Sequence, residues 1–284
     1  MTAPAFPDPS PAAPDEASLE HAATATSRSR FGLFRFTIEG RRAPGLFVGG
    51  WLATLVGSGL VAIGVLAAPS LLTAIVLLGG LATLTLGLVL LGGSQSIERQ
   101  AAAEPYGGPS PLLLLVATVS ATLLVAALVG IVLEAAGVSF GRSQLPVGDL
   151  ISVAVQALVF IGMVRLMVVG SGALTWAEMG FSRDLRQVAR GLLTGAVYAV
   201  PVIVLTSLVA LVVVPLVGQT PPSPLPPTGT ATGLGLHLLA GAAIGPVAEE
   251  TIFRGAALSA WLRSVNPTVA ITRTAVLFAA AHAL

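Results

Sequence analysis

The chain has 284 residues, of which 55% are hydrophobic and only 10% are charged, and its mean hydropathy is +0.91. Because a soluble domain carries about a quarter charged residues, this composition excludes the ordinary soluble classes and indicates an integral membrane protein. The net charge is +1, and the arginines are dispersed without a basic helix or an aromatic–basic patch, which argues against a nucleic-acid partner. The absence of cysteine excludes disulfides and thiolate metal ligands.

The first 43 residues differ from the rest of the chain. Residues 1–30 are rich in Ala, Pro, Ser and Thr and contain no long apolar run. Such a composition cannot bury enough apolar surface to fold, and the stretch also lacks the basic start and apolar centre of a signal peptide. We therefore predict a disordered cytoplasmic tail over residues 1–43.

Apolar segments follow in regular succession, separated by Gly, Pro and charged residues. We place seven of them at about 46–67, 69–93, 112–136, 147–170, 188–217, 234–262 and 268–284. Each of the first six is long enough to cross a hydrocarbon core of about 30 Å at about 1.5 Å per residue, and the seventh is incomplete. The predicted fold is an all-α, polytopic bundle of transmembrane helices, with a first group of helices over 44–170 and a second part over 171–284.

The arginines orient this bundle. If the N-terminus is cytoplasmic, ten arginines lie on the inner side and only Arg142 lies in an outer loop. The inner set is Arg28, Arg30, Arg35, Arg41, Arg42, Arg99, Arg183, Arg186, Arg190 and Arg263. This asymmetry follows the positive-inside rule, so we expect a multi-pass protein of a bacterial inner membrane with a cytoplasmic N-terminus.

Two adjacent carboxylates, Glu249 and Glu250, interrupt the sixth apolar segment, with Arg254 four residues later. An ionised group near the centre of a membrane helix costs about 2.5–3.5 kcal/mol, so such residues are functional candidates by default. Residues four apart share a helix face, which places Glu250 and Arg254 for an ion pair. Glu249 lies about 100° further round the helix and stays free for proton transfer.

The next segment supplies an imidazole at a matching depth. Glu249 lies about 21 Å above Arg263, and His282 about 22 Å above Pro267, if both segments are helical and form an antiparallel hairpin. We therefore predict a buried cluster of Glu249, Glu250 and His282. Such a cluster can polarise a water molecule for attack on an amide carbonyl, with or without a divalent metal such as zinc. The candidate metal ligands are the same three residues.

Two further expectations concern the sixth segment. Gly245-Pro246 is predicted to break or kink the helix, which would place both glutamates in the first turn of the continuing helix, at its positive dipole end. His237, upstream of the break, is expected at the membrane interface.

The motif Pro246-x-x-Glu249-Glu250-x-x-Phe253-Arg254-Gly255, followed by Phe278-x-x-x-His282, resembles the first two motifs of the CPBP family. That family contains the CAAX-processing endopeptidases of the Rce1 type and bacterial Abi-type proteins. The segment Trp176–Phe181 resembles a short stretch that precedes the family's core helices. The similarity covers about residues 175–284. It implies an intramembrane endopeptidase core over 171–284, in which Glu249 and His282 activate water while Glu250 and Arg254 support them.

The family pattern continues with a further helix that carries another His and an Asn or Asp, and the 284 residues end before it. The chain is then either a fragment or a truncated relative, and we expect these residues alone to be inactive. One alternative function is a non-catalytic membrane scaffold of the bacteriocin-immunity type. Another is a transporter with a carboxylate proton or cation site. For the endopeptidase, the expected partners are the lipid bilayer and a peptide or protein substrate.

Overall fold

A computed structural model describes residues 40–138, 145–182, 184–218 and 230–283. Most of the predicted disordered tail, residues 1–39, lies outside the described residues. Residues 42–284 form one compact unit, and the description below is confined to it.

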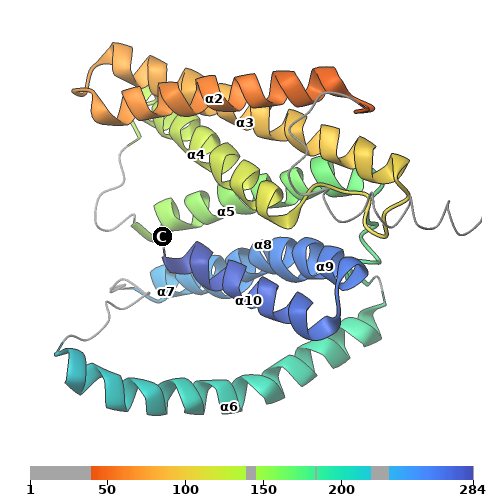
Figure 1. The fold of residues 1–284 in the computed structure, drawn as a ribbon. Coiled ribbons are helices and arrows are strands. Elements are labelled where there is room, and N and C mark those ends of the chain that lie inside the picture. Colours follow the sequence, from red (N-terminus) through yellow and green to blue (C-terminus); the bar gives the residue numbers. More distant parts are fainter. Residues whose placement is uncertain (1–39, 139–144, 183, 219–229, 284) are drawn as a thin grey trace, which may run out of the picture. The chain divides into compact units, whose positions relative to one another are not determined.

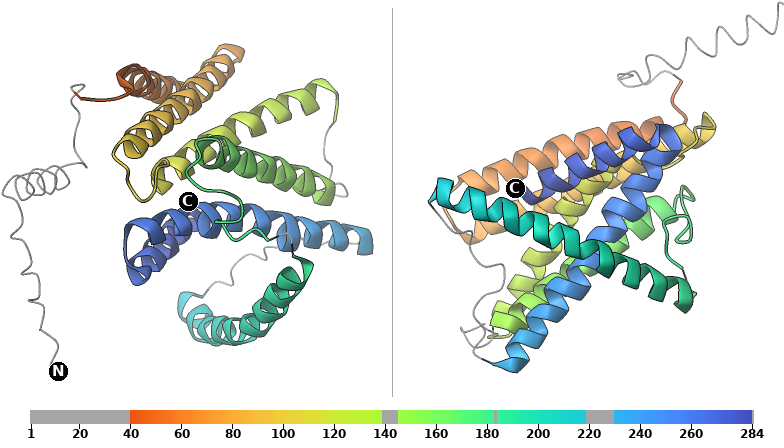
Figure 2. Two further views of the ribbon diagram at one scale, coloured as in Figure 1. Left: turned by 90° about the vertical axis from the view of Figure 1, so that its right-hand side faces the viewer. Right: turned by 90° about the horizontal axis from the view of Figure 1, so that it is seen from below.

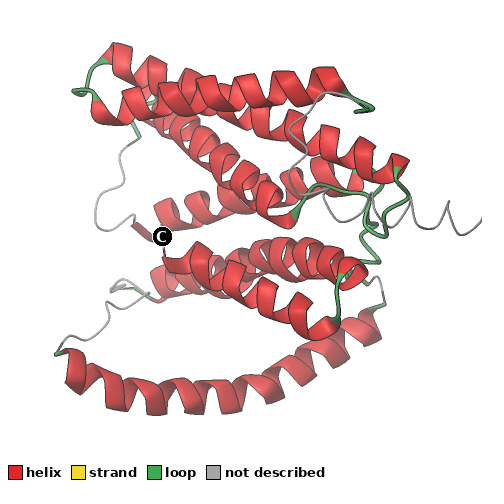
Figure 3. Cartoon of the chain, in the orientation of Figure 1, coloured by secondary structure: helices red, strands yellow, loops and turns green. Residues whose placement is uncertain are grey.

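Every regular element in the described ranges is a helix (Figures 1 and 3). In chain order these are α2 (Pro44–Leu66), α3 (Leu71–Ala101), α4 (Pro111–Ala135), α5 (Leu145–Val164) with the π-helical η3 (Arg165–Val169), α6 (Leu185–Val217), α7 (Ala231–Leu238), η4 (Leu239–Ile244), α8 (Gly245–Glu250), η5 (Thr251–Leu258), α9 (Ser259–Ser264) and α10 (Pro267–Ala283). Six stretches are long and apolar enough to cross a membrane, the sixth being the continuous run Ala231–Ser264. The predicted polytopic helical bundle is thus confirmed, and α10 adds the seventh apolar helix.

Helix α3 differs from its predicted length. The sequence suggests an end near residue 93, yet the helix continues to Ala101. Two polar side chains of this extension find partners: Ser96 is buried and donates to the carbonyl of Gly92, and Arg99 donates to the carbonyl of Gly108. Ser94 is buried without a hydrogen-bond partner for its hydroxyl among the described residues. Polarity alone therefore does not end this helix, whose polar side chains bond to its own backbone and to the following loop.

Glycines bring α2 and α3 into close contact. Gly50, Gly57 and Gly64 follow each other at intervals of seven residues along one face of α2. A Cβ atom at Gly57 would lie 2.9 Å from the carbonyl oxygen of Gly80 and closer still to the backbone nitrogen of Leu84. Small residues allow this kind of backbone approach, which replaces the hydrophobic effect as the source of helix association in lipid.

We expect Gly57→Leu to separate α2 from α3 and to destabilise the folded protein by about 1–3 kcal/mol, as overpacking does. Gly59→Leu is the matched control, because a Cβ at Gly59 meets nothing within 4 Å. Unfolding in lipid bicelles measures both variants. Equal losses of stability in the two would show that the close approach contributes nothing.

Helix α6 is exposed along its whole described length apart from the half-buried Val214. Its 32-residue apolar stretch contains no buried side chain. The helix continues through Pro201 and Pro215 and curves along its length (Figure 1), as expected when proline removes a backbone hydrogen bond.

The predicted break at Pro246 is wrong, because residues 231–264 stay helical throughout. The turn before Pro246 is the π-helical η4, and a second π-helical segment, η5, begins directly after Glu250. A π-helical turn widens the backbone ring and accommodates a residue without an N–H group, so proline does not end the helix. The two glutamates therefore lie inside a continuous helix rather than at a positive helix terminus.

One face of this long helix forms part of the protein core. Ala248, Ile252 and Ala256 are each at most 2% exposed and belong to a cluster with residues of α4 and α5, such as Leu114 and Val164. Helix α10 packs against η5 and α9 of this long helix, and Figure 2 shows α9 next to α10. The buried face fixes the rotation of the helix, and thereby the direction of the charged residues on its other sides.

Candidate active site

Glu249 and His282 meet across the hairpin formed by the long helix and α10. Glu249 Oε1 lies 3.7 Å from His282 Nε2, and the two side chains are 35% and 46% exposed. The short connection at residues 265–266 makes the helices antiparallel, so residues at equal distances from the turn reach the same depth. The structure thus brings these two predicted site residues together, but the predicted burial of the cluster is wrong, since Glu249, Glu250 and His282 are all partly exposed.

Two aromatic rings set the position of the imidazole. Phe253, one turn after Glu249, contacts Phe278 edge to face with ring centroids 5.1 Å apart. Phe278 in turn stacks on His282 at 4.1 Å. Each helix therefore contributes an i, i+4 pair, and the two pairs face each other, with the aromatic contact beside the carboxylate–imidazole contact.

A backbone hydrogen bond selects the histidine tautomer. His282 Nδ1 lies 2.8 Å from the carbonyl oxygen of Phe278. A carbonyl oxygen can only accept, so Nδ1 donates, and in the neutral imidazole Nε2 is then an acceptor that faces Glu249. Because 3.7 Å exceeds a direct hydrogen bond, the two acceptors can share a molecule that donates to both.

Glu250 is paired locally. Its Oε2 atom lies 3.1 Å from Nε of Arg254, and the side chains are 48% and 75% exposed. The acid precedes the base by one turn, the favourable order on a helix. The two adjacent glutamates consequently differ: the charge of Glu250 is compensated by Arg254, whereas Glu249 faces the imidazole.

Replacing only one partner of the Glu250–Arg254 pair should destabilise the protein more than replacing both partners. We expect Arg254→Gln to destabilise the protein in lipid because it leaves Glu250 uncompensated, and Glu250→Gln/Arg254→Gln to recover much of the loss. The coupling energy expected for residues in contact is about 0.5–3 kcal/mol. Reversible unfolding in bicelles of the two single variants and the double variant measures it, and strictly additive losses would contradict the pairing.

The candidate metal ligands Glu249, Glu250 and His282 do not form a three-ligand set. Glu250 is turned to Arg254, which leaves Glu249 and His282 as a pair. Within the described ranges, no group of three His, Asp or Glu side chains is arranged to hold a metal ion. Of the three candidate ligands, Glu249 and His282 face each other whereas Glu250 does not, and no step below depends on a metal.

The connector between η3 and α6 is fastened to the long helix by Glu178. Its carboxylate accepts from the backbone N–H of Thr175 at 2.6 Å and from the Thr175 hydroxyl at 2.9 Å. Arg263 Nη2 of α9 donates to its other oxygen at 2.6 Å. The Thr175 hydrogen bonds first, and then Arg263, lower the pKa of Glu178 from 4.5 to about 2.

This pKa shift predicts an acid-dependent connector. A carboxylate whose pKa is depressed on folding stabilises the fold fully above its unfolded value, and the contribution disappears as the pH falls through the folded value. The stability difference between the wild type and Glu178→Gln should therefore be constant above pH 4.5 and vanish towards pH 2. Unfolding in detergent at stepped pH measures this difference. A difference that ends already near pH 4.5 would contradict the hydrogen-bonded arrangement.

His237 is buried where α7 meets α5. Its side chain is 4% exposed, and Nδ1 lies 3.3 Å from Asp149 Oδ2 of α5, while Nε2 is buried and has no hydrogen-bond partner among the described residues. His237 is therefore buried within the protein, because α7 packs it against α5. Asp149 lies 88 positions earlier in the chain, and no local sequence signal links the two residues.

Comparison with known proteins bears on the same segment. A family model described as type II CAAX prenyl endopeptidase Rce1-like matches residues 231–284. No curated protein and no solved structure gives a significant match. The matched residues include both glutamates, Arg254 and the Phe278–His282 motif, so the family resemblance read from the motifs is confirmed over this segment.

Proposed function

We propose that the protein is an intramembrane endopeptidase in which Glu249 and His282 activate a water molecule for attack on a peptide bond. The observation that carries this proposal is the 3.7 Å approach of Glu249 Oε1 and His282 Nε2, with the imidazole oriented by the Phe278 carbonyl. The family match over residues 231–284 supports hydrolysis of a peptide as the reaction class.

In this mechanism the attacking water donates one O–H group to Glu249 and the other to Nε2 of His282. Glu249 takes the proton as the water oxygen bonds to the carbonyl carbon, which forms a tetrahedral intermediate. When the C–N bond breaks, the protonated Glu249 delivers its proton to the leaving nitrogen. The second water proton, bonded to Nε2 of His282, passes through that nitrogen to the amine, so the products are a carboxylate terminus and an ammonium terminus, and no covalent acyl-enzyme forms.

Glu250 and Arg254 have a supporting role. Two uncompensated carboxylates side by side would repel each other. The ion pair of Glu250 with Arg254 at 3.1 Å limits this repulsion, so that Glu249 can act as the single free base. Arg254 is in this view a partner of Glu250 rather than a ligand of the substrate.

The lipid bilayer defines the setting of the reaction. The six apolar spans make this a multi-pass membrane protein, and the arginine distribution favours a bacterial inner membrane with a cytoplasmic N-terminus. In that orientation the turn at residues 265–266 and the connector 171–182 lie on the cytoplasmic side.

The proposal predicts that Glu249→Gln and His282→Ala each lower peptide cleavage by about 10²–10⁴-fold, the usual contribution of a positioned acid–base group. The protein expressed from its complete reading frame and reconstituted in liposomes provides the assay. Glu134→Gln on α4 and Arg273→Gln on α10 are controls, because both side chains are exposed and neither belongs to the proposed site. Retained cleavage in both site variants, with normal membrane insertion, would refute the proposal.

A further inference from the structure

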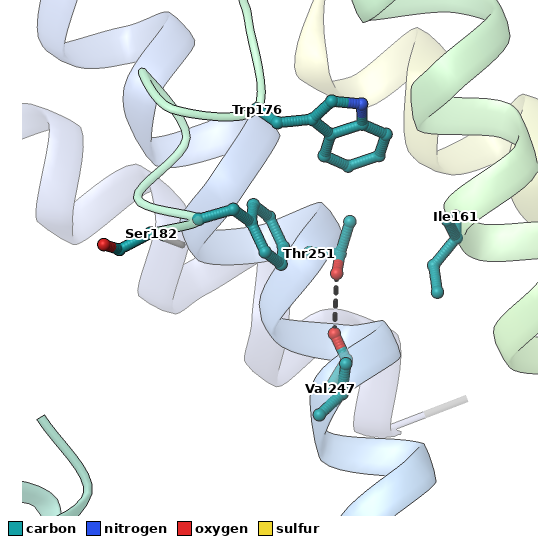
Figure 4. A pocket seen from close by; sticks show the side chains of 6 residues that line it. Ile161, Trp176, Ser182, Val247 and Thr251 are labelled. Atoms are coloured by element: carbon teal, nitrogen blue, oxygen red, sulfur yellow. Dashed lines mark hydrogen bonds between the residues drawn. The ribbon is translucent and has the colours of Figure 1, made fainter. Parts of the chain in front are cut away.

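We infer that an apolar pocket on the far side of the Glu250–Arg254 pair binds one aromatic or branched aliphatic side chain of the peptide substrate. This inference rests on the proposed endopeptidase function and adds a specificity site to it. The pocket lies where the connector crosses α5 and the long helix, and its lining residues are Ile161, Trp176, Phe181, Ser182, Val247 and Thr251 (Figure 4).

The pocket wall is apolar because its hydroxyl groups already have partners. The buried Thr251 donates to the carbonyl oxygen of Val247 at 2.7 Å, as the dashed line in Figure 4 marks. Ser182 donates to Gln187 Oε1 at 2.6 Å, and Figure 4 shows its hydroxyl pointing away from Thr251. The wall offers no free hydroxyl donor and is mostly apolar, so an apolar group is the occupant that it favours.

The size of the pocket matches a single side chain. Its volume is about 270 Å³, whereas an apolar cavity of about 150 Å³ already holds benzene. A leucine or phenylalanine side chain can therefore enter, but a long isoprenoid chain would extend beyond the space. For this reason the proposal commits to a peptide side chain as the occupant.

The connector that forms one wall is held in place at several points. Trp176 and Phe181 contact each other edge to face at 5.4 Å. A Cβ atom at Gly255 would lie 3.5 Å from Cε2 of Phe181 and 3.5 Å from Cβ of Met179, so the connector packs directly against the helix there. The Glu178–Arg263 contact fastens the same segment to α9. A pocket wall fixed in this way can discriminate between side chains instead of adapting to each.

An exposed path joins the pocket to the proposed reaction centre. Going round the helix from Glu249, Glu250 lies about 100° further and Thr251 about 100° beyond it. The intervening surface carries the half-exposed Glu250 and the exposed Arg254 and Val247. Half the circumference of a helix of about 11 Å diameter is roughly 17 Å, which an extended peptide spans with about five residues. The recognised side chain should therefore lie about five residues from the bond that is cut.

The test uses short, unprenylated fluorogenic peptides of alanine and serine in which one leucine or phenylalanine is moved along the sequence. We expect kcat/KM to rise at least about tenfold at one position, about five residues from the cleavage point, since a pocket discriminates by roughly 10–200-fold per methylene. Ile161→Trp fills the pocket and should abolish this preference. Leu158→Trp, on the same helix but 73% exposed, is the matched control and should keep it.

A second variant keeps the inference testable if Ile161→Trp fails to fold. Phe181 is 40% exposed, so Phe181→Ala should fold normally, enlarge the pocket and shift the preference from leucine towards tryptophan. Cleavage without any positional preference would overturn the inference, and so would a preference that survives Ile161→Trp. A preference for a prenyl group that Ile161→Trp abolishes would also overturn it, because the pocket would then hold the lipid.

A binding experiment separates this inference from the proposed function. The same peptides, with a benzophenone side chain as the movable residue, are cross-linked to the Glu249→Gln variant. We expect attachment to residues of the connector or α5, and loss of attachment in Glu249→Gln/Ile161→Trp. If cross-linking depends on Ile161 but the wild-type protein cleaves no peptide, the hydrolytic function is refuted and the pocket is supported. Peptide cleavage by the wild type without such cross-linking would refute the pocket while supporting the hydrolytic function.

Discussion

The candidate site depends on one packing arrangement, in which two i, i+4 pairs on antiparallel helices face each other. Glu249 and Phe253 belong to the long helix, and Phe278 and His282 belong to α10. The edge-to-face contact of the two phenylalanines fixes the rotation of α10 about its axis. The stacking of Phe278 on the imidazole then fixes the orientation of the His282 ring. Aromatic contacts of this kind contribute about 0.5–1.5 kcal/mol beyond their burial, which suffices to favour one orientation of a ring.

Charge placement follows from the same geometry. A carboxylate in an apolar helix is expensive unless it is compensated or used. Glu250 is compensated within its own helix by Arg254, and this pairing needs no other part of the protein. Glu249 meets its partner only through the hairpin, so its environment depends on whether α10 is docked. Local and non-local neutralisation thus give two adjacent, chemically identical residues different roles.

Small residues make both the scaffold and the site possible. Glycines along α2 let α3 approach its backbone, and alanines on the buried face of the long helix, such as Ala248 and Ala256, let it lie close to the core. Gly255 has the same effect on the other side, where it admits the connector and its Phe181. In a solvent as apolar as the side chains themselves, close backbone approach is the main source of specific packing.

The sequence by itself determined what depends on length, composition and local spacing. The apolar runs set the helices and their number, the four-residue spacing of Glu250 and Arg254 set an ion pair, and counting from the turn placed Glu249 and His282 at one depth. Only the tertiary structure decided what depends on rotation and on distant neighbours. This second group contains the direction of His282 and the burial of His237 against Asp149. It also contains the continuity of the helix through Pro246 and the pocket beneath the connector. The physical reason is that rise along a helix accumulates from the chain itself, whereas rotation about the helix axis is set by the residues that pack against it, and these lie far away in the sequence.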